Sequence, residues 1–298
     1  MSKLRLELCS ECCFDCVFCH HDQVNMTDTE NKKLDASDYG FLCKVGKLCG
    51  FNHVLLSGGE PLIRKDINDI MRNIKDSGVH LQVTSNGYLL GNVKDKTLID
   101  SINISIHSLD LATNEKIINK KYALPKVIDN VYTLREKSPK TSIKINMVAL
   151  KDKTIEVNNL RKMLDFSAEN GITLKIIELL DETSAGFISV EDIAKILEGF
   201  GFSKTRKRLH KVFYSNGQVD VILQKCFCQY AKHERCSEVF CNKNNDLFVL
   251  SNGEVQLCRY GGGDRSLYDM IKARDTKNLL KALKECKLAL GKNCIYDK

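Results

Sequence analysis

The sequence of 298 residues contains no long apolar run. This absence excludes a membrane-spanning helix, which needs about 20 consecutive apolar residues. The first residues, Met1–Leu8, alternate in polarity and lack the apolar core of a secretory signal peptide. Internal repeats and low-complexity tracts are also absent. We therefore expect a globular, cytoplasmic protein that does not act at a membrane.

A strong excess of one charge is missing as well. The net charge of +7 suits an anionic ligand but does not produce the dense basic surface of a nucleic-acid binder. The most basic stretch, Lys204–Lys211 (KTRKRLHK), has no interleaved aromatic residues and is typical of a solvated face or hairpin edge. We expect no nucleic-acid partner.

Cysteine is absent from the middle of the chain, residues 50–225, although the sequence contains 14 cysteines. Five lie in Cys9–Cys19, two are Cys43 and Cys49, and seven occur from Cys226 onward. The cytosol keeps thiols reduced, so this number indicates metal binding rather than disulfides. Cys43 and Cys49 have apolar helical neighbours and are expected in the core. The other two groups predict one metal site near each end of the chain.

Strand-like and helix-like segments alternate through the first two thirds of the chain. Six β-branched runs predict strands: residues 4–8, 53–57, 80–84, 102–107, 142–150 and 173–178. Helical patterns separate them, so parallel βαβ units are expected, either as a partial barrel or as an open doubly wound sheet. After Asp181 a helix, two hairpins with Asn-Gly turns and a last helix over Thr276–Leu290 predict an α+β appendage. We divide the chain into domains at residues 1–225 and 226–298.

A cysteine loop, CSECCFDCVFC, follows the first predicted strand. Cys12, Cys16 and Cys19 have the spacing C-x3-C-x2-C, so three thiolates could each hold one iron of a cuboidal cluster. Such a cluster keeps its fourth iron open to a small molecule. A zinc site completed by His20 or His21 is the alternative. Cys9 and Cys13 fit the spacing less well and are treated as non-ligands.

A second motif follows the next predicted strand, where Gly58-Gly59-Glu60-Pro61 begins directly after Ser57. Two glycines at this position allow a ligand to approach the backbone closely, and the adjacent carboxylate could receive an amine. The motif could also be an ordinary strand-to-helix turn. Its position after the cysteine loop favours a cofactor site.

Together these motifs resemble the radical S-adenosylmethionine (SAM) superfamily, in which a partial (β/α)6 barrel is expected. The resemblance implies that Cys12, Cys16 and Cys19 bind a [4Fe–4S] cluster whose open iron holds SAM. It also implies reductive cleavage of SAM to a 5′-deoxyadenosyl radical, which abstracts hydrogen from a substrate. The implied SAM-binding residues are Phe18, Gly58, Gly59, Glu60, Pro61, Thr84, Ser85, Asn86, Ser105 and Leu180.

The C-terminal cysteines resemble the auxiliary-cluster segment of twitch and SPASM members of this superfamily. Cys236, Cys241 and Cys258 are the implied ligands of a second iron–sulfur cluster, and Cys241 and Cys258 bracket a predicted hairpin. A structural zinc ribbon is the alternative. Further ligands could come from four other cysteines: Cys226, Cys228, Cys286 and Cys294.

Over nearly its whole length the chain is most similar to the GTP 3′,8-cyclase group of the superfamily. Arg5 and Lys144 align with substrate-side positions and are the implied catalytic residues. However, two substrate-binding arginines of that group fall at Asp246 and Phe248, which removes bidentate phosphate recognition. The group's two C-terminal glycines have no counterpart in GKNCIYDK.

We therefore expect a radical SAM enzyme that acts on a small polar, nucleotide-like or peptide substrate. A low-potential electron donor of the flavodoxin or ferredoxin type would reduce it. The sequence predicts that GTP binds weakly and is not cyclised, because a carboxylate at Asp246 would oppose a triphosphate. GTP 3′,8-cyclisation is the first alternative, and a non-catalytic iron–sulfur or zinc protein is the second.

Overall fold

The computed structural model describes most of the chain, in six stretches: residues 3–19, 33–179, 183–208, 210–225, 246–257 and 265–290. Several residues singled out above lie outside these stretches: Leu180, Cys226, Cys228, Cys236, Cys241, Cys258 and Cys294. Their predicted roles stay predictions.

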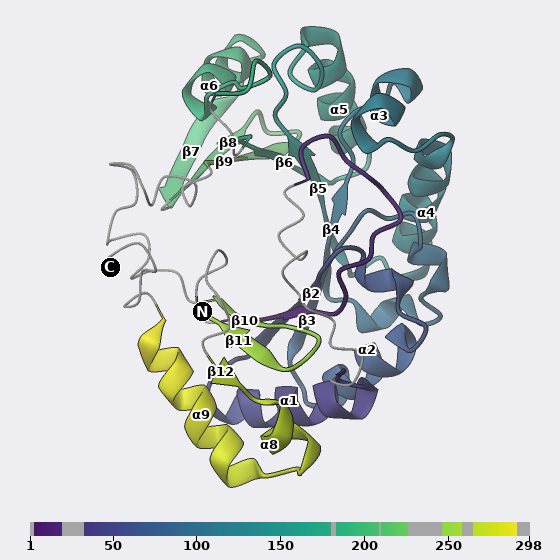
Figure 1. Ribbon diagram of the computed structural model, residues 1–298. Helices are drawn as coiled ribbons and strands as arrows, with labels where there is room; N and C mark the ends of the chain where they lie inside the picture. The colour runs from purple at the N-terminus through teal and green to yellow at the C-terminus, as the bar shows by residue number, and fades with distance from the viewer. Residues whose placement is uncertain are drawn as a thin grey trace.

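Six parallel strands form the centre of the sheet: β1 (Lys3–Glu7), β2 (His53–Ser57), β3 (His80–Ser85), β4 (Ser101–Ser105), β5 (Ser142–Val148) and β6 (Thr173–Ile177). They lie side by side in chain order. A doubly wound sheet reverses its order at a switch point, and this sheet does not, so the structure decides for the partial barrel. Figure 1 shows the sheet curving around an inner face, with helices on the outside.

The helices between these strands are α1 (Ala36–Leu48), α2 (Ile67–Asp76), α3 (Leu111–Ile118), α4 (Ala123–Lys137) and α5 (Val157–Glu169). Short 3-10 turns η1 (Pro61–Ile63), η2 (Leu90–Asn92) and η3 (Lys96–Leu98) add to the connections. Strand side chains alternate between the two faces of a sheet. In β1, Leu4 and Leu6 are fully buried in the core on the helix side, which places Lys3 and Arg5 on the inner face.

Later elements extend both edges of the sheet. After α6 (Val190–Gly199), β9 (Asp220–Gln224) pairs parallel with β6 and continues through β8 (Lys211–Ser215) to β7 (Ser203–Arg208). At the other edge, β10 (Asp246–Val249) pairs parallel with β1 and continues through β11 (Glu254–Gln256) to β12 (Arg265–Ser266). Both predicted hairpins are therefore confirmed. Residues 204–208 of the basic stretch belong to β7, an exposed edge strand, whereas Lys211 begins β8.

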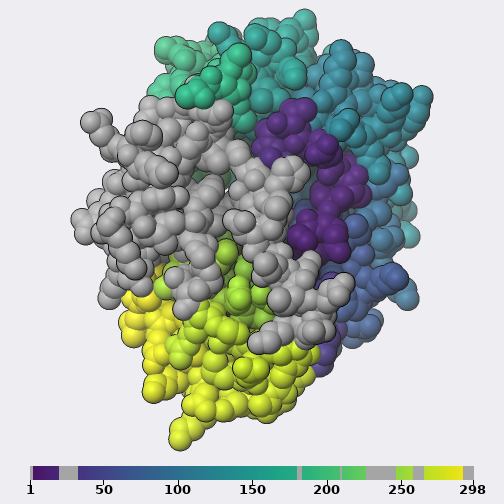
Figure 2. Space-filling model, viewed as in Figure 1, coloured from purple at the N-terminus to yellow at the C-terminus, as the bar shows by residue number. Residues whose placement is uncertain are grey.

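The C-terminal helices α8 (Tyr268–Lys272) and α9 (Thr276–Ala289) pack near α1. Cys43, Cys49 and Cys286 are buried in the core. In the part of the chain that the structure describes, strands from both sides of residue 225 belong to one sheet of 12 strands, and the division at that residue stays a prediction. Among the residues that the structure describes, no helix is long and apolar enough to cross a membrane. Figure 2 shows part of residues 3–19, in purple, at the surface of the face in view, whereas Leu4, Leu6 and Leu8 in this segment are buried.

Candidate active site

The cysteine loop leaves β1 and is held by backbone hydrogen bonds on two sides. The Leu8 amide donates to the Ser57 carbonyl at the end of β2, at 2.9 Å. Further along, the Asp15 and Val17 amides donate to carbonyls in the last turn of α3, at 3.1 and 2.9 Å. The loop therefore lies at the carboxyl ends of the strands, where parallel αβ barrels carry their chemistry.

Two of the three predicted ligand thiols, Cys12 and Cys19, act electrostatically on the third, Cys16. Cys12 and Cys19 are exposed, and Cys16 is half-buried. Burial, and then the neighbouring Cys12 and Cys19, raise the pKa of the Cys16 thiol to about 12. Metal binding would have to displace these protons, as it does in thiolate sites generally.

The donor set fits an iron–sulfur cluster, because each thiolate of such a cluster binds a different iron. Within the described stretches, no group of three or more His, Cys, Asp or Glu side chains is placed to hold one metal ion. His20 and His21, which belong to the zinc alternative, lie outside those stretches.

The glycine turn packs against the cysteine loop itself. The Gly59 amide donates to the Cys9 carbonyl and the Glu60 amide donates to the Glu11 carbonyl, both at 2.8 Å. A Cβ on Gly59 would lie 2.2 Å from the Glu11 carbonyl oxygen, and Gly58 has a φ of +134°. The sequence attributed these glycines to the approach of a ligand. The structure shows that they also admit the backbone of the loop that carries the cysteines.

The Glu60 side chain turns away from the surface and is fully buried. One carboxylate oxygen accepts from the Leu62 amide at 3.0 Å and from the Ser85 hydroxyl at 2.9 Å. The other accepts from the Asn86 amide at 2.7 Å. Burial raises the pKa of Glu60 to about 7 despite these three donors. The sequence implied that this carboxylate meets the SAM amine directly; in the structure it is fully buried and accepts from these three donors.

The end of β3 brings three more predicted residues to the same place. The Asn86 side-chain amide donates to Cys13 Sγ at 3.2 Å and lies 3.8 Å from Cys12 Sγ. Ser85 is committed to Glu60 and is buried. Thr84 accepts from Asn103 on the inner face at 3.1 Å, and Ser105 ends the neighbouring strand β4. Hydrogen bonds to ligand sulfurs are one way in which a protein sets the potential of a cluster.

A cavity of about 540 Å³ opens beside the last thiol. Its apolar wall contains Phe18, Leu150 and Leu179, and its rim contains Cys19, Asp152 and Lys153. Phe18 also packs edge-on against the buried His107, at 4.7 Å between ring centroids. Burial lowers the pKa of His107 to about 4, so this imidazole is neutral at physiological pH. The sequence identified Phe18 and missed the rest of this wall, although Leu179 directly precedes the predicted Leu180.

The inner face of the barrel is basic. Burial lowers the pKa of Lys3 on β1; Asp246 opposes this shift, and Arg5 and Lys144 add to it. Burial likewise lowers the pKa of Lys211 on β8, with contributions from Lys3, Lys144 and Arg5. Charges from β1, β5 and β8 therefore act on one another across the barrel. The sequence predicts a solvated stretch that includes Lys211, and no pattern in it singles out Lys3.

Asp246 lies within this basic group and forms an ion pair with Arg5 at 3.4 Å. Arg5 also stacks on Phe248, with its guanidinium carbon 5.0 Å from the ring centroid. The two positions that replace arginines thus both contact an arginine of β1. The sequence predicts that a carboxylate at Asp246 opposes a triphosphate; in the structure this carboxylate is paired with Arg5 and acts on Lys3 and Lys211.

Comparisons with known proteins agree with this geometry. Residues 6–164, just over half of the chain, match the family model of the radical SAM superfamily. A probable GTP 3′,8-cyclase of Methanothermobacter thermautotrophicus is 32% identical over 271 residues, covering 86% of this chain and 83% of that protein. Another, from Pyrobaculum aerophilum, is 29% identical over 297 residues, covering 95% and 92%.

Solved structures show the same fold. Streptococcus suis SuiB bound to S-adenosylmethionine superimposes with a TM-score of 0.65 at 16% identity, covering 97% of this chain and 68% of that one. The protein anSMEcpe with bound AdoMet gives a TM-score of 0.58 at 14% identity, covering 96% and 83%. From its cysteine loop, its barrel and its family match, this chain belongs to the radical SAM superfamily, as an enzyme that uses a [4Fe–4S] cluster and SAM.

Proposed function

We propose that this radical SAM enzyme acts on an anionic, nucleotide-like small molecule held against the inner face of its barrel. The basic group on that face carries the proposal. Lys3, Arg5 and Lys144 influence Lys211 across the barrel, and Asp246 is the opposing charge among them. Cations confined to a partly buried surface attract and orient anions more strongly than exposed ones do.

Separate groups of residues would hold the cluster, bind SAM and orient the substrate. Cys12, Cys16 and Cys19 would hold the cluster, with Glu60 and Asn86 fixing the backbone beside it. A bound cluster and SAM supply reductive cleavage of SAM and the hydrogen abstraction that follows. The apolar cavity beside Phe18 is suited to the adenosine part of SAM. Arg5 and Lys144 would orient the substrate as the catalytic residues.

The test is an anaerobic assay of SAM cleavage by reconstituted protein with a chemical reductant. We expect nucleotides and other phosphorylated or carboxylated compounds to raise 5′-deoxyadenosine formation above the rate without substrate. Replacing Lys144 by Met should remove the stimulation while the rate without substrate stays near wild type. Stimulation only by neutral compounds or peptides would refute the substrate class and leave the radical SAM assignment intact.

GTP 3′,8-cyclisation is the second candidate, and the relatives favour it. Proteins described as probable GTP 3′,8-cyclases match nearly the whole chain. Against it stands Phe248, which offers no hydrogen bond to a phosphate. Anaerobic turnover with GTP, analysed for the 3′,8-cyclised product, separates the two. Stoichiometric product would establish cyclisation, whereas stimulation by another anion without this product would reject it.

We further propose a second iron–sulfur cluster on Cys236, Cys241 and Cys258, and a flavodoxin or ferredoxin as the physiological electron donor. The support is the spacing of these cysteines and the similarity to the cyclase group, in which a second cluster is typical. Iron and sulfide analysis after anaerobic reconstitution tests the cluster. Replacing the chemical reductant with a purified flavodoxin system tests the donor.

A further inference from the structure

Arg64 contacts both ends of the segment that carries the cysteines. Arg64 is the residue after η1, the 3-10 turn that begins at the last residue of the Gly58–Pro61 motif. Its side chain is only 8% exposed. Nη1 donates to the Leu8 carbonyl at 3.2 Å, and Nη2 donates to the Leu34 carbonyl at 3.1 Å. Leu8 immediately precedes Cys9, and Leu34 immediately precedes the N-cap of α1. All five cysteines of the loop lie between these two carbonyls.

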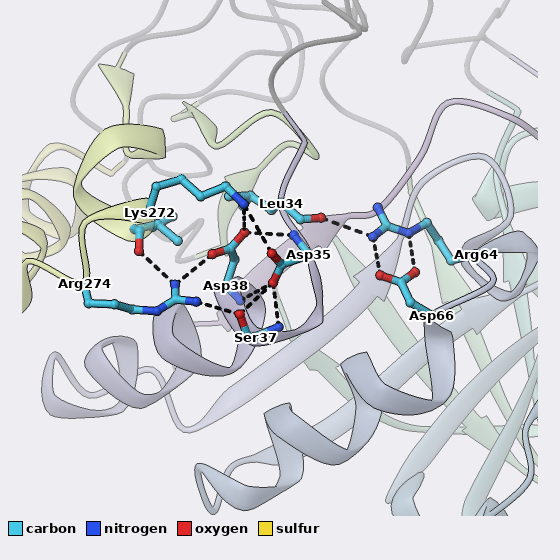
Figure 3. Close-up of polar contacts among 9 residues, drawn as sticks. Leu34, Asp35, Ser37, Asp38, Arg64, Asp66, Lys272 and Arg274 are labelled. Atoms are coloured by element: carbon cyan, nitrogen blue, oxygen red, sulfur yellow. Dashed lines mark hydrogen bonds and ion pairs between the residues drawn. The ribbon is translucent and has the colours of Figure 1, made fainter.

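The guanidinium is itself held in place. Asp66 accepts from Nε at 2.8 Å and from Nη2 at 2.7 Å, a bidentate pair. The fully buried Tyr39 ring lies beneath it, 5.9 Å from ring centroid to guanidinium carbon. Figure 3 shows Arg64 between Asp66 and the Leu34 carbonyl. A planar fork with five donors can serve these partners together, whereas a lysine ammonium cannot.

The Leu34 end has additional anchors from the C-terminal part of the chain. The Leu34 amide donates to the Ser251 carbonyl, in the turn between β10 and β11, at 2.8 Å. In the network of Figure 3, the buried Asp38 accepts from Arg274 at 2.7 Å and also from Lys272. This end of the segment is therefore fixed to α1, α8 and the hairpin. Arg64 joins that fixed point to the end of β1.

We infer that Arg64 is a positioning residue for the SAM-binding cluster: it closes the cysteine segment by joining the Leu8 and Leu34 carbonyls. The thiolates sit on a loop, and a loop can hold a cluster geometry only as well as its ends are fixed. The same residue ties this loop to the glycine turn, which contacts Cys9 and Glu11. The inference rests on the proposed ligands Cys12, Cys16 and Cys19.

The test compares Arg64→Lys and Arg64→Gln with wild type, as reconstituted full-length protein. The matched control is Arg72→Gln, which removes an exposed guanidinium paired with Asp69 on α2. Three quantities are measured: melting temperature before reconstitution, iron per chain, and the electron paramagnetic resonance spectrum of the reduced protein during titration with SAM. The spectral change reports SAM binding at the cluster without depending on turnover.

We expect Arg64→Lys to melt at a somewhat lower temperature, because it loses buried charge-assisted hydrogen bonds, and to keep an iron content close to wild type. The SAM concentration that gives half of the spectral change should rise by about tenfold, the effect of losing charge-assisted hydrogen bonds at one site. Arg64→Gln should show a larger rise, and Arg72→Gln none. An unchanged titration in both variants would overturn the inference. A lower iron content and a lower melting temperature, combined with a normal SAM titration of the protein that still binds iron, would also overturn it. A wild-type spectrum that does not respond to SAM would instead overturn the ligand assignment itself.

Discussion

Replacing Glu60 by Gln distinguishes a carboxylate that binds SAM from one that fixes the site. Gln has nearly the same shape, and its oxygen can still accept from Leu62 and Ser85. Its NH2 group would then face the Asn86 amide, which now donates to a carboxylate oxygen at 2.7 Å. Leaving that buried donor without an acceptor costs roughly 1–3 kcal/mol. We therefore expect the apo-protein of this variant to be less stable by about that amount.

The pH dependence gives a second, independent signature. Burial raises the pKa of Glu60 from an ordinary 4.5 to about 7. Between these pH values the folded protein keeps a proton that the unfolded chain has released, so this group's contribution to stability falls as the pH rises. A shift of this size corresponds to about 3 kcal/mol between pH 4.5 and pH 7. The advantage of wild type over Glu60→Gln should therefore be about 1–3 kcal/mol near pH 4.5 and should vanish or reverse above pH 7.

Denaturant unfolding of both apo-proteins at several pH values from 4.5 to 8 measures both effects. Glu169→Gln, an exposed substitution on α5, is the control and should follow the wild-type curve. Parallel stability curves for wild type and Glu60→Gln would refute the raised pKa. Wild-type stability combined with lost SAM binding would refute the positioning role and restore the direct contact that the sequence implied.

The remaining predictions concern the metal sites and the inner face. Replacing Cys12, Cys16 and Cys19 together by Ala should abolish 5′-deoxyadenosine formation in the anaerobic assay, and persistent cleavage would contradict the ligand assignment. Fully reconstituted wild type should hold about eight irons per chain if both clusters are cubanes, and the triple variant about four. Zinc in place of iron in that variant would show a zinc ribbon at the C-terminal cysteines. Replacing Asp246 by Asn should strengthen GTP binding by roughly fivefold at low salt, a modest effect because the pair with Arg5 is partly exposed. Equilibrium binding measures it, with the exposed Asp220→Asn as control, and weaker binding would show that Asp246 orients Arg5 rather than opposing anions.

Local patterns were sufficient to predict most of the fold. The alternation of apolar runs located all six central strands, and the Asn-Gly turns located both hairpins. Asp35 is the N-cap of α1 and accepts hydrogen bonds from the Ser37 and Asp38 amides, a role that aspartate favours. Periodicity could not choose between a barrel and an open sheet, because strand order depends on contacts between distant segments.

The cofactor site was predictable in its residues but not in their roles. Spacing alone placed Cys12, Cys16 and Cys19 on one loop, and the glycine motif marked the adjacent turn. Nothing local in the sequence shows that the Glu60 carboxylate turns inward to β3, or that Gly59 must accommodate the Glu11 carbonyl. Arg64 was overlooked for the same reason, since its partners lie 56 and 30 residues away in the chain.

The substrate side was the hardest part to predict, because charge on an inner surface is a property of several strands at once. In the sequence, Asp246 stands alone as a carboxylate in the place of an arginine. In the structure it pairs with Arg5, and its influence reaches Lys3 and Lys211. Lys211 follows a run of exposed residues in β7, yet it begins the strand that returns toward the barrel. Which charged side chains meet on this face therefore depends on the arrangement of the sheet, which brings β1, β10 and β8 around one space. A substitution that looked unfavourable for phosphate, taken by itself, therefore lies beside an arginine and within reach of two lysines in the structure.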